Sequence, residues 1–286
     1  MNHHITIGST GSWQKAATPG EPHVRYVESN MADNHPVFEP PADRDARLWR
    51  YMDFSKFVSL LHHRALYCAR ADLLGDPFEG SVSKETIRQR LVRFEDIRAA
   101  AKRGGKPDAV LKISGILSDV RRWTYVSCWH LNMVESAAMW KLHSYSSEAI
   151  AVQSTFQRLF DALPSKHYLG MVKYIDYETE WMPDGNIMYP IMHKRRSFAH
   201  EQEARAVYLE LPAAAPGKGG ELEVNVHQQN SREGIMVPIP LDAVIETIYI
   251  APAAPKWFAE LVQGVKDKYG FRFPVKQSAL DSSPVY

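Results

Sequence analysis

Two glutamates separated by one residue are the first candidates for chemistry in this chain. Glu201 and Glu203 lie at the head of a strand-like run, residues 204–211, with the sequence ARAVYLEL. Because side chains alternate along an extended chain, this spacing predicts that both carboxylates share one face. One carboxylate could stabilise positive charge on a sugar, and the other could orient or deprotonate an acceptor. The structural alternative is a charged strand end that pairs with Arg205 or Arg196.

Two upstream segments supply further candidates. Arg50 lies in an aromatic, strand-like segment, and its guanidinium could bind a pyrophosphate through two parallel hydrogen bonds. Ser127 lies in an apolar strand-like segment and could brace a catalytic glutamate or the sugar. The structural alternatives are a salt bridge for Arg50 and a satisfied core hydroxyl for Ser127. Rings that could stack on nicotinamide or adenine, or pack in the core, are those of Tyr51, Trp129 and Trp140.

A turn-like segment, Asp76-Pro77-Phe78-Glu79-Gly80, points to a different chemistry. Asp76, Glu79 and Glu203 together could bind Mg²⁺, as in a metal-dependent nuclease. Such sites usually include a Glu-x-Lys on a following strand, and no such motif follows this turn. We therefore expect a structural turn and no metal site. The sequence also lacks a Gly-rich phosphate loop, a Gly-x-Ser-x-Gly elbow and a clustered Cys/His motif.

Composition limits the function classes. The chain has 286 residues and a formal net charge of +1, which gives no overall field for nucleic acid or membrane. Its two cysteines are too few for a disulfide framework. No apolar run has the roughly 18 residues that a membrane helix needs, and no signal peptide is recognisable. These features predict a cytoplasmic protein with no membrane partner.

The pattern of elements predicts an α+β fold of mixed, mostly antiparallel sheets with inserted helices, because strands and helices interleave irregularly. Residues 1–45 are rich in Gly, Pro, His and Asn and are expected to form a poorly structured arm, followed by a single α+β domain, residues 46–286. Helices are predicted at residues 54–63, within 83–122, and at 136–143, 156–163, 188–197 and 256–268. Strands are predicted at 49–52, 65–69, 123–128, 149–153, 170–177, 204–211, 235–239 and 245–250, and residues 271–275 are predicted to form a strand or an extended end.

Several of these segments together resemble a bacterial domain family of unknown function. The segments are Leu48-Trp49-Arg50-Tyr51, Leu66-Tyr67, Asp76-Pro77-Phe78-Glu79, Ser127-Cys128-Trp129, Met139-Trp140, the strand at 149–153 and Glu201-x-Glu203-x-Arg205. This likeness spans roughly residues 46–280, and it implies no activity by itself.

The ordered Arg, Ser and Glu-x-Glu also resemble the Arg-Ser-Glu type of ADP-ribosyltransferase. That resemblance implies NAD as a substrate, with Arg50 on its phosphates or ribose. It implies that Ser127 positions NAD, that Glu203 is the catalytic glutamate, and that Glu201 acts on the acceptor. The run Ser127-Cys128-Trp129 departs from the family's usual Ser-Thr-Ser, and the long spacings require inserted helices.

Three functional hypotheses follow. The first is an NAD-consuming transferase, suited to a toxin or a phage-defence effector, whose acceptor is a protein, a nucleic acid or a small molecule. The second is the metal-dependent nuclease, and the third is a non-catalytic binding module. The first hypothesis requires Arg50 and Glu203 to meet in one cleft. The sequence assigns neither the acceptor nor the oligomeric state.

Overall fold

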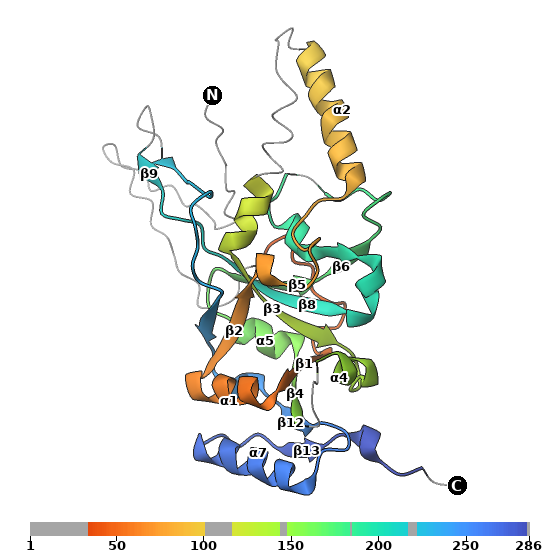
Figure 1. Cartoon of the computed structure of the whole chain (residues 1–286), viewed down its shortest axis with the longest axis vertical. Coiled ribbons are helices and arrows are strands. Elements are labelled where there is room, and N and C mark those ends of the chain that lie inside the picture. Colours follow the sequence, from red (N-terminus) through yellow and green to blue (C-terminus); the bar gives the residue numbers. More distant parts are fainter. Residues whose placement is uncertain (1–33, 101–115, 144–147, 184, 217–221, 285–286) are drawn as a thin grey trace.

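Within the residues that the computed structural model describes, the fold is mixed α+β, built on an open nine-stranded sheet (Figure 1). The described residues are 34–100, 116–143, 148–183, 185–216 and 222–284. The sheet contains β1 (Arg47–Asp53), β2 (Ala65–Arg70), β3 (Thr124–Leu131), β4 (Ala149–Thr155), β5 (His167–Met171), β8 (Glu203–Leu209), β11 (Gly234–Pro238), β12 (Thr247–Ile250) and β13 (Val275–Gln277). Among the described residues, every strand pair in this sheet is antiparallel except β12 with β13. The predicted α+β class is confirmed at this level.

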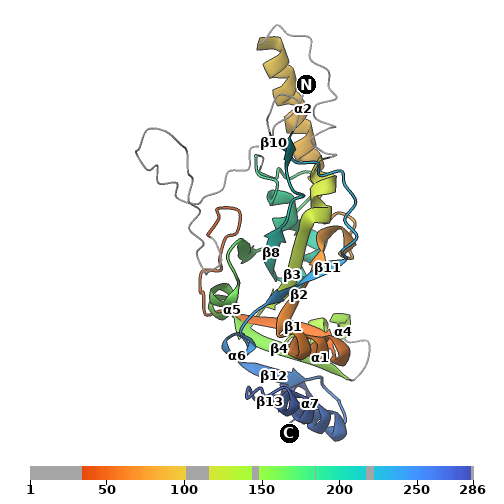
Figure 2. The same cartoon turned by 90° about the vertical axis from the view of Figure 1, so that its left-hand side faces the viewer.

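The strand order is β11-β2-β3-β1-β4-β12-β13, with β8 also beside β3 and β5 beside β8. Two short ladders lie outside this sheet: β6 (Lys173–Ile175) with β7 (His193–Arg195), and β9 (Ala215–Pro216) with β10 (Leu222–Glu223). The α-helices are α1 (Phe54–His63), α2 (Lys84–Ala100), α4 (Ala137–His143), α5 (Phe156–Ala162), α6 (Leu241–Val244) and α7 (Lys256–Lys268), and residues 116–120 are also helical. Figure 2 shows α2 extending from the end of the molecule opposite α7.

Local sequence explains why α1 forms where it does. Asp53 accepts a hydrogen bond from the Lys56 backbone N at 2.8 Å and caps the helix. Phe57, Leu60 and Leu61 recur at helical spacing and are buried. With α5 and α7, α1 covers one face of the sheet and forms the largest core. On the other face, α4 packs on β1 and β4 through Met139 and Trp140.

Two predicted elements are wrong. Residues 188–197 are not an α-helix but a 3₁₀ turn (Tyr189–Met192), then β7, then a second 3₁₀ segment (Arg196–Glu201). Pro190 has no N–H to donate within a helix, and residues 193–195 pair with β6 instead. The single strand predicted at 170–177 is likewise divided into the end of β5 and β6.

The packed structure begins ahead of the predicted boundary at residue 46. Val37 and Phe38 are buried, and they pack with Val126 and Val207 of the sheet. The Met171 backbone N donates to Glu39 O at 2.8 Å, which attaches this segment to the end of β5. Residues 1–33 of the predicted arm lie outside the described residues.

Candidate functional site

A gap in the sheet lies along one edge of β3. Near its start, Tyr125 and Val126 pair with β2, and near its end His130 and Leu131 pair with β1. Among the described residues, Ser127 to Trp129 have no strand partner on that edge, although on the other edge they pair continuously with β8. The strands β1 and β2 therefore diverge from each other along β3.

A cleft of about 620 Å³ opens at this gap. Its walls come from β1, α1, β2, β3, α4, β11 and the turn that precedes β8. The lining residues are Trp49, Arg50, Tyr51, Met52, Lys56, Ser59, Leu60, Ala65, Tyr67, Ala69, Leu74, Val126, Cys128, Trp129, His130, Met139, His143, Glu201, Glu203 and Met236. Mostly apolar walls with a few charged groups are typical of small-molecule sites.

Arg50 is a cation in this cleft that has no acidic partner among the described residues. Its Nη2 donates to the Tyr67 carbonyl across the gap at 2.9 Å, and its guanidinium carbon lies 5.9 Å from the Trp129 ring centroid. Burial lowers the pKa of Arg50 from its ordinary value. A partly buried guanidinium with most of its donors unused is suited to an anionic ligand.

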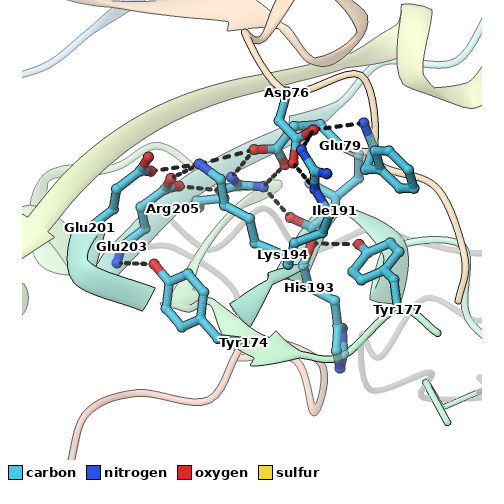
Figure 3. A network of polar contacts seen from close by, with 12 residues as sticks. Asp76, Glu79, Tyr174, Tyr177, Ile191, His193, Lys194, Glu201, Glu203 and Arg205 are labelled. Atoms are coloured by element: carbon cyan, nitrogen blue, oxygen red, sulfur yellow. Dashed lines mark hydrogen bonds and ion pairs between the residues drawn. The ribbon is translucent and has the colours of Figure 1, made fainter. Parts of the chain in front are cut away.

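Glu201 and Glu203, which line the cleft, belong to a charged cluster of seven side chains, most of which Figure 3 labels. Its members are Asp76, Glu79, Lys194, Arg195, Glu201, Glu203 and Arg205. Arg205, 1% exposed, is its centre: the two Nη atoms each donate to Glu79 at 2.8 Å, and Nε donates to Glu203 at 2.6 Å. Nη1 also donates to the Ile191 carbonyl at 2.6 Å. This dense pairing offsets the cost of burying the charges.

Lys194 connects the two glutamates that the sequence singled out. Its Nζ lies 2.5 Å from Glu201, 2.6 Å from Glu203 and 3.2 Å from Glu79. Burial would lower the pKa of Lys194, but the charges of Glu203 and its neighbours raise it above its ordinary value. Lys194 is therefore a fixed cation shared by the carboxylates.

The two glutamates have different electrostatic environments. Burial would raise the pKa of Glu203, but the Arg205 guanidinium and Lys194 hold it well below its ordinary range. For Glu201, burial and the neighbouring Glu203 raise the pKa to about 7, although Lys194 opposes them. The cluster holds four carboxylates against three cations, so one carboxylate lacks a full counter-charge. Glu201 is that group, and it can exchange a proton near neutral pH.

The orientation of the pair does not arise from strand alternation, which corrects the sequence prediction. Only Glu203 lies on β8; Glu201 ends the preceding 3₁₀ segment. Between them, Gln202 has a left-handed backbone with φ of 40°. This turn directs both carboxylates to Lys194, and it is held by the Leu131 N to Gln202 O bond at 2.9 Å.

Other predicted site residues have mixed outcomes. Tyr51 and Trp129 line the cleft. Trp140 does not; its ring is edge-on to Tyr51 at 5.0 Å between centroids, so it supports the cleft wall from behind. Ser127 is opposite Ala206 in the β3–β8 ladder and faces the large core, away from Glu203. The expected role of Ser127 in bracing Glu203 is therefore not supported.

The carboxylates of the nuclease hypothesis are paired with side-chain cations. Asp76 accepts two hydrogen bonds from Arg195, at 2.7 and 3.1 Å, while Glu79 and Glu203 share Arg205. No group of three or more His, Cys, Asp or Glu side chains with metal-binding geometry occurs among the described residues. The turn that contains Asp76 and Glu79 thus contributes two anions to the charged cluster. The hypothesis of a binding module stays a prediction.

Sequence reasoning did not assign a site role to Lys194 or His130. Lys194 lies in a segment that was predicted to be helical, and that prediction gave no reason to expect a contact with Glu201 or Glu203. His130 follows directly after the Ser-Cys-Trp segment. It is 3% exposed and lines the cleft. His130 is placed in the cleft by its strand pairing with Trp49 on one side and Glu203 on the other. The sequence does not show which strands pair, so it gave no indication of this position.

Comparison of the chain with models of protein families, with curated proteins and with solved structures found no significant match. The resemblance to the bacterial family and to ADP-ribosyltransferases thus stays a prediction. Among the described residues, no helix has the length and apolar character needed to cross a membrane.

Proposed function

We propose that the cleft binds NAD and that the protein cleaves its nicotinamide–ribose bond, in the manner of an ADP-ribosyltransferase. The observation that carries this proposal is that Arg50 and the Glu201/Glu203 pair, about 150 residues apart in sequence, line one cleft. This shared lining supports the first sequence hypothesis, which required Arg50 and Glu203 to meet in one cleft. A cleft of about 620 Å³ lies within the range of ligand pockets.

The lining of the cleft includes charges of both signs. Arg50 would bind the phosphates, since its guanidinium has no carboxylate partner among the described residues. Tyr51 and Trp129 line the cleft but are 8% and 2% exposed, so only a small part of each ring would contact the base or the nicotinamide. Glu203 stays ionised and would face the ribose, where positive charge develops as the bond breaks.

The proposed step is a substitution at the ribose C1′. The bond from C1′ to the nicotinamide nitrogen breaks, and its electron pair leaves with nicotinamide, which becomes neutral. An acceptor hydroxyl, or water, forms the new bond to C1′ and loses its proton to Glu201. A carboxylate with a pKa of about 7 is suited to this transfer near neutral pH. An enzyme of this kind would deplete NAD, which suits a toxin or defence effector.

The test is incubation of the protein with NAD labelled in the nicotinamide ring, with released nicotinamide measured over time. We expect wild-type release to fall by at least ten-fold in Glu201→Gln and Glu203→Gln. Thermal melting must show that both variants are folded, because Glu203→Gln also weakens the pairing of Arg205. Equal release from the wild type and both variants would remove the glutamates from the mechanism.

The binding half is tested with Arg50→Met and a matched control, Arg47→Met. Arg47 lies on the same strand but donates to the Met133 carbonyl and does not line the cleft. We expect NAD affinity, measured by calorimetry, to fall about ten-fold or more in Arg50→Met and to be unchanged in the control. NAD binding of equal strength in all three proteins would refute the role of Arg50.

A further inference from the structure

The two ring nitrogens of His130 differ in their hydrogen bonding: Nδ1 contacts the Glu201 main chain, and Nε2 has no partner among the described residues. Nδ1 lies 2.6 Å from the Glu201 carbonyl oxygen. A carbonyl oxygen only accepts, so Nδ1 carries the hydrogen and donates it. Burial lowers the pKa of His130, so the ring is neutral and Nε2 keeps its lone pair. The tautomer is therefore fixed by the Glu201 main chain.

Nε2 is an acceptor without a donor among the described residues. It is buried, and His130, 3% exposed, lines the cleft beside Glu201. A buried acceptor without a partner is unfavourable, because nothing replaces the hydrogen bond that it would make to water. Such groups are rare in folded proteins and are often completed by water or a ligand. Because His130 lines the cleft, a donor on a ligand, such as a hydroxyl or an amide N–H, is the fitting partner for this buried atom.

The turn next to Glu201 has an unfavourable backbone conformation that needs hydrogen bonds to fix it. Gln202 has a left-handed conformation, which a residue with a side chain adopts at a cost. The end of β3 fixes this turn at two successive peptide groups, through His130 Nδ1 to Glu201 O and Leu131 N to Gln202 O. Without the first bond, the peptide group of Glu201 would lose its hydrogen bond to β3, and only the bond at Gln202 would tie the turn to that strand.

We infer that His130 is a two-sided positioning residue: its Nδ1–H holds Glu201 in the cleft, and its Nε2 accepts a hydrogen bond from a donor on the bound ligand. The ligand class is thereby narrowed to molecules that carry an anionic group for Arg50 and a hydrogen-bond donor for His130. The ligand half of this inference rests on the proposed function, with NAD as the probe. The half that concerns Glu201 does not depend on NAD.

Asparagine and glutamine can separate the two roles, because each side-chain amide matches one ring nitrogen in distance from the backbone. His130→Asn keeps a donor near the Nδ1 position and loses the acceptor. His130→Gln places an amide near the Nε2 position and loses the donor to Glu201. His130→Phe loses both and shows the cost of removing the polar atoms altogether.

Two measurements on the full chain read these roles. The first is the titration of the Glu201 carboxyl carbon by NMR on ¹³C-glutamate-labelled protein without ligand, assigned with Glu201→Gln. The groups that face Glu201 are Lys194 and Glu203, while His143 and Arg50 share the cleft. We expect the midpoint to be kept in His130→Asn and displaced in His130→Gln and His130→Phe. An unchanged midpoint in all three variants would overturn the positioning of Glu201.

The second measurement is the Kd of NAD. We expect about three- to ten-fold weaker binding in His130→Asn and His130→Phe, and near-wild-type binding in His130→Gln, as for one neutral hydrogen bond. Equal Kd values in wild type and His130→Asn would overturn the acceptor role. If the wild type does not bind NAD at all, the proposed function fails, while the NMR titration still decides the role of His130 toward Glu201.

Discussion

Arg205 offers the sharpest test of the charged cluster. Arg205→Met keeps most of the side-chain volume but removes all four of the arginine's hydrogen bonds, to Glu79, Glu203 and the Ile191 carbonyl. The side chains of Glu79 and Glu203 are 2% and 7% exposed, so water cannot replace the hydrogen bonds that these carboxylates lose. Removing one partner of a buried ion pair costs about 3–5 kcal/mol. For a chain of this length, that corresponds to a melting temperature lower by about 5–8 °C.

The assay is urea unfolding at pH 7.5, followed by tryptophan fluorescence. Arg196→Met is the matched control, because its ion pair with Glu180 is exposed, with side chains 62% and 38% accessible. We expect the control to change the free energy of unfolding by less than about 1 kcal/mol. A cost below 1 kcal/mol for Arg205→Met, or equal costs for both variants, would refute the assignment of Arg205 as the centre of the cluster.

The pH dependence adds a second check on Arg205. In the wild type, the pKa of Glu203 is held well below its unfolded value, so its contribution to stability is present above about pH 4.5 and is lost as pH falls through the folded pKa. In Arg205→Met, burial without the guanidinium raises the pKa of Glu203. The cost of the substitution should therefore be greatest at neutral pH and shrink toward pH 5. A cost that grows as pH falls would contradict this sign.

Three further predictions concern single sites. Burial raises the folded pKa of Glu201 to about 7, so wild-type stability should fall as pH rises from about 4.5 through 7, and Glu201→Gln should lack this fall in urea midpoints measured against pH. Gly170→Ala should destabilise by about 1–3 kcal/mol, since its Cβ would lie 2.6 Å from the Phe38 backbone, whereas Gly264→Ala in α7 meets nothing within 4 Å and should stabilise by about 0.5–1 kcal/mol; melting curves of both variants decide this. At Gln202, with φ of 40°, glycine should be tolerated and valine should cost about 1–2 kcal/mol; equal unfolding midpoints for the two variants would show that the turn is not strained.

Much of the secondary structure was predictable because its signals are local. The helix at 54–63 was confirmed with the predicted bounds, since its cap and its apolar period lie within ten residues. The strands at 149–153 and 204–211 were also located, within two residues at each end. The prediction failed at 188–197, where residues 193–195 found a β-strand partner in β6, twenty residues earlier in the chain.

The candidate site was predictable only in part. The choice of Arg50, Glu201 and Glu203 came from residue type and order, and the structure brings these three to one cleft. Ser127 fulfilled the same pattern but faces the large core, because its position in the β3–β8 register sets its direction. Register depends on which strands pair, and this information is not contained in the strand itself.

The sequence by itself determined the class of fold, most of the helices and strands, and the identity of three charged residues in the cleft. Only the tertiary structure decided that β1 and β2 pair with opposite ends of β3 and diverge from each other between them, which opens the cleft beside Arg50. It also decided that Lys194 and Arg205 neutralise Glu203 and leave Glu201 as the titratable member of the pair. The physical reason is distance: helix periods and caps act within a few residues, whereas the charge of a buried carboxylate is set by partners that only folding brings near.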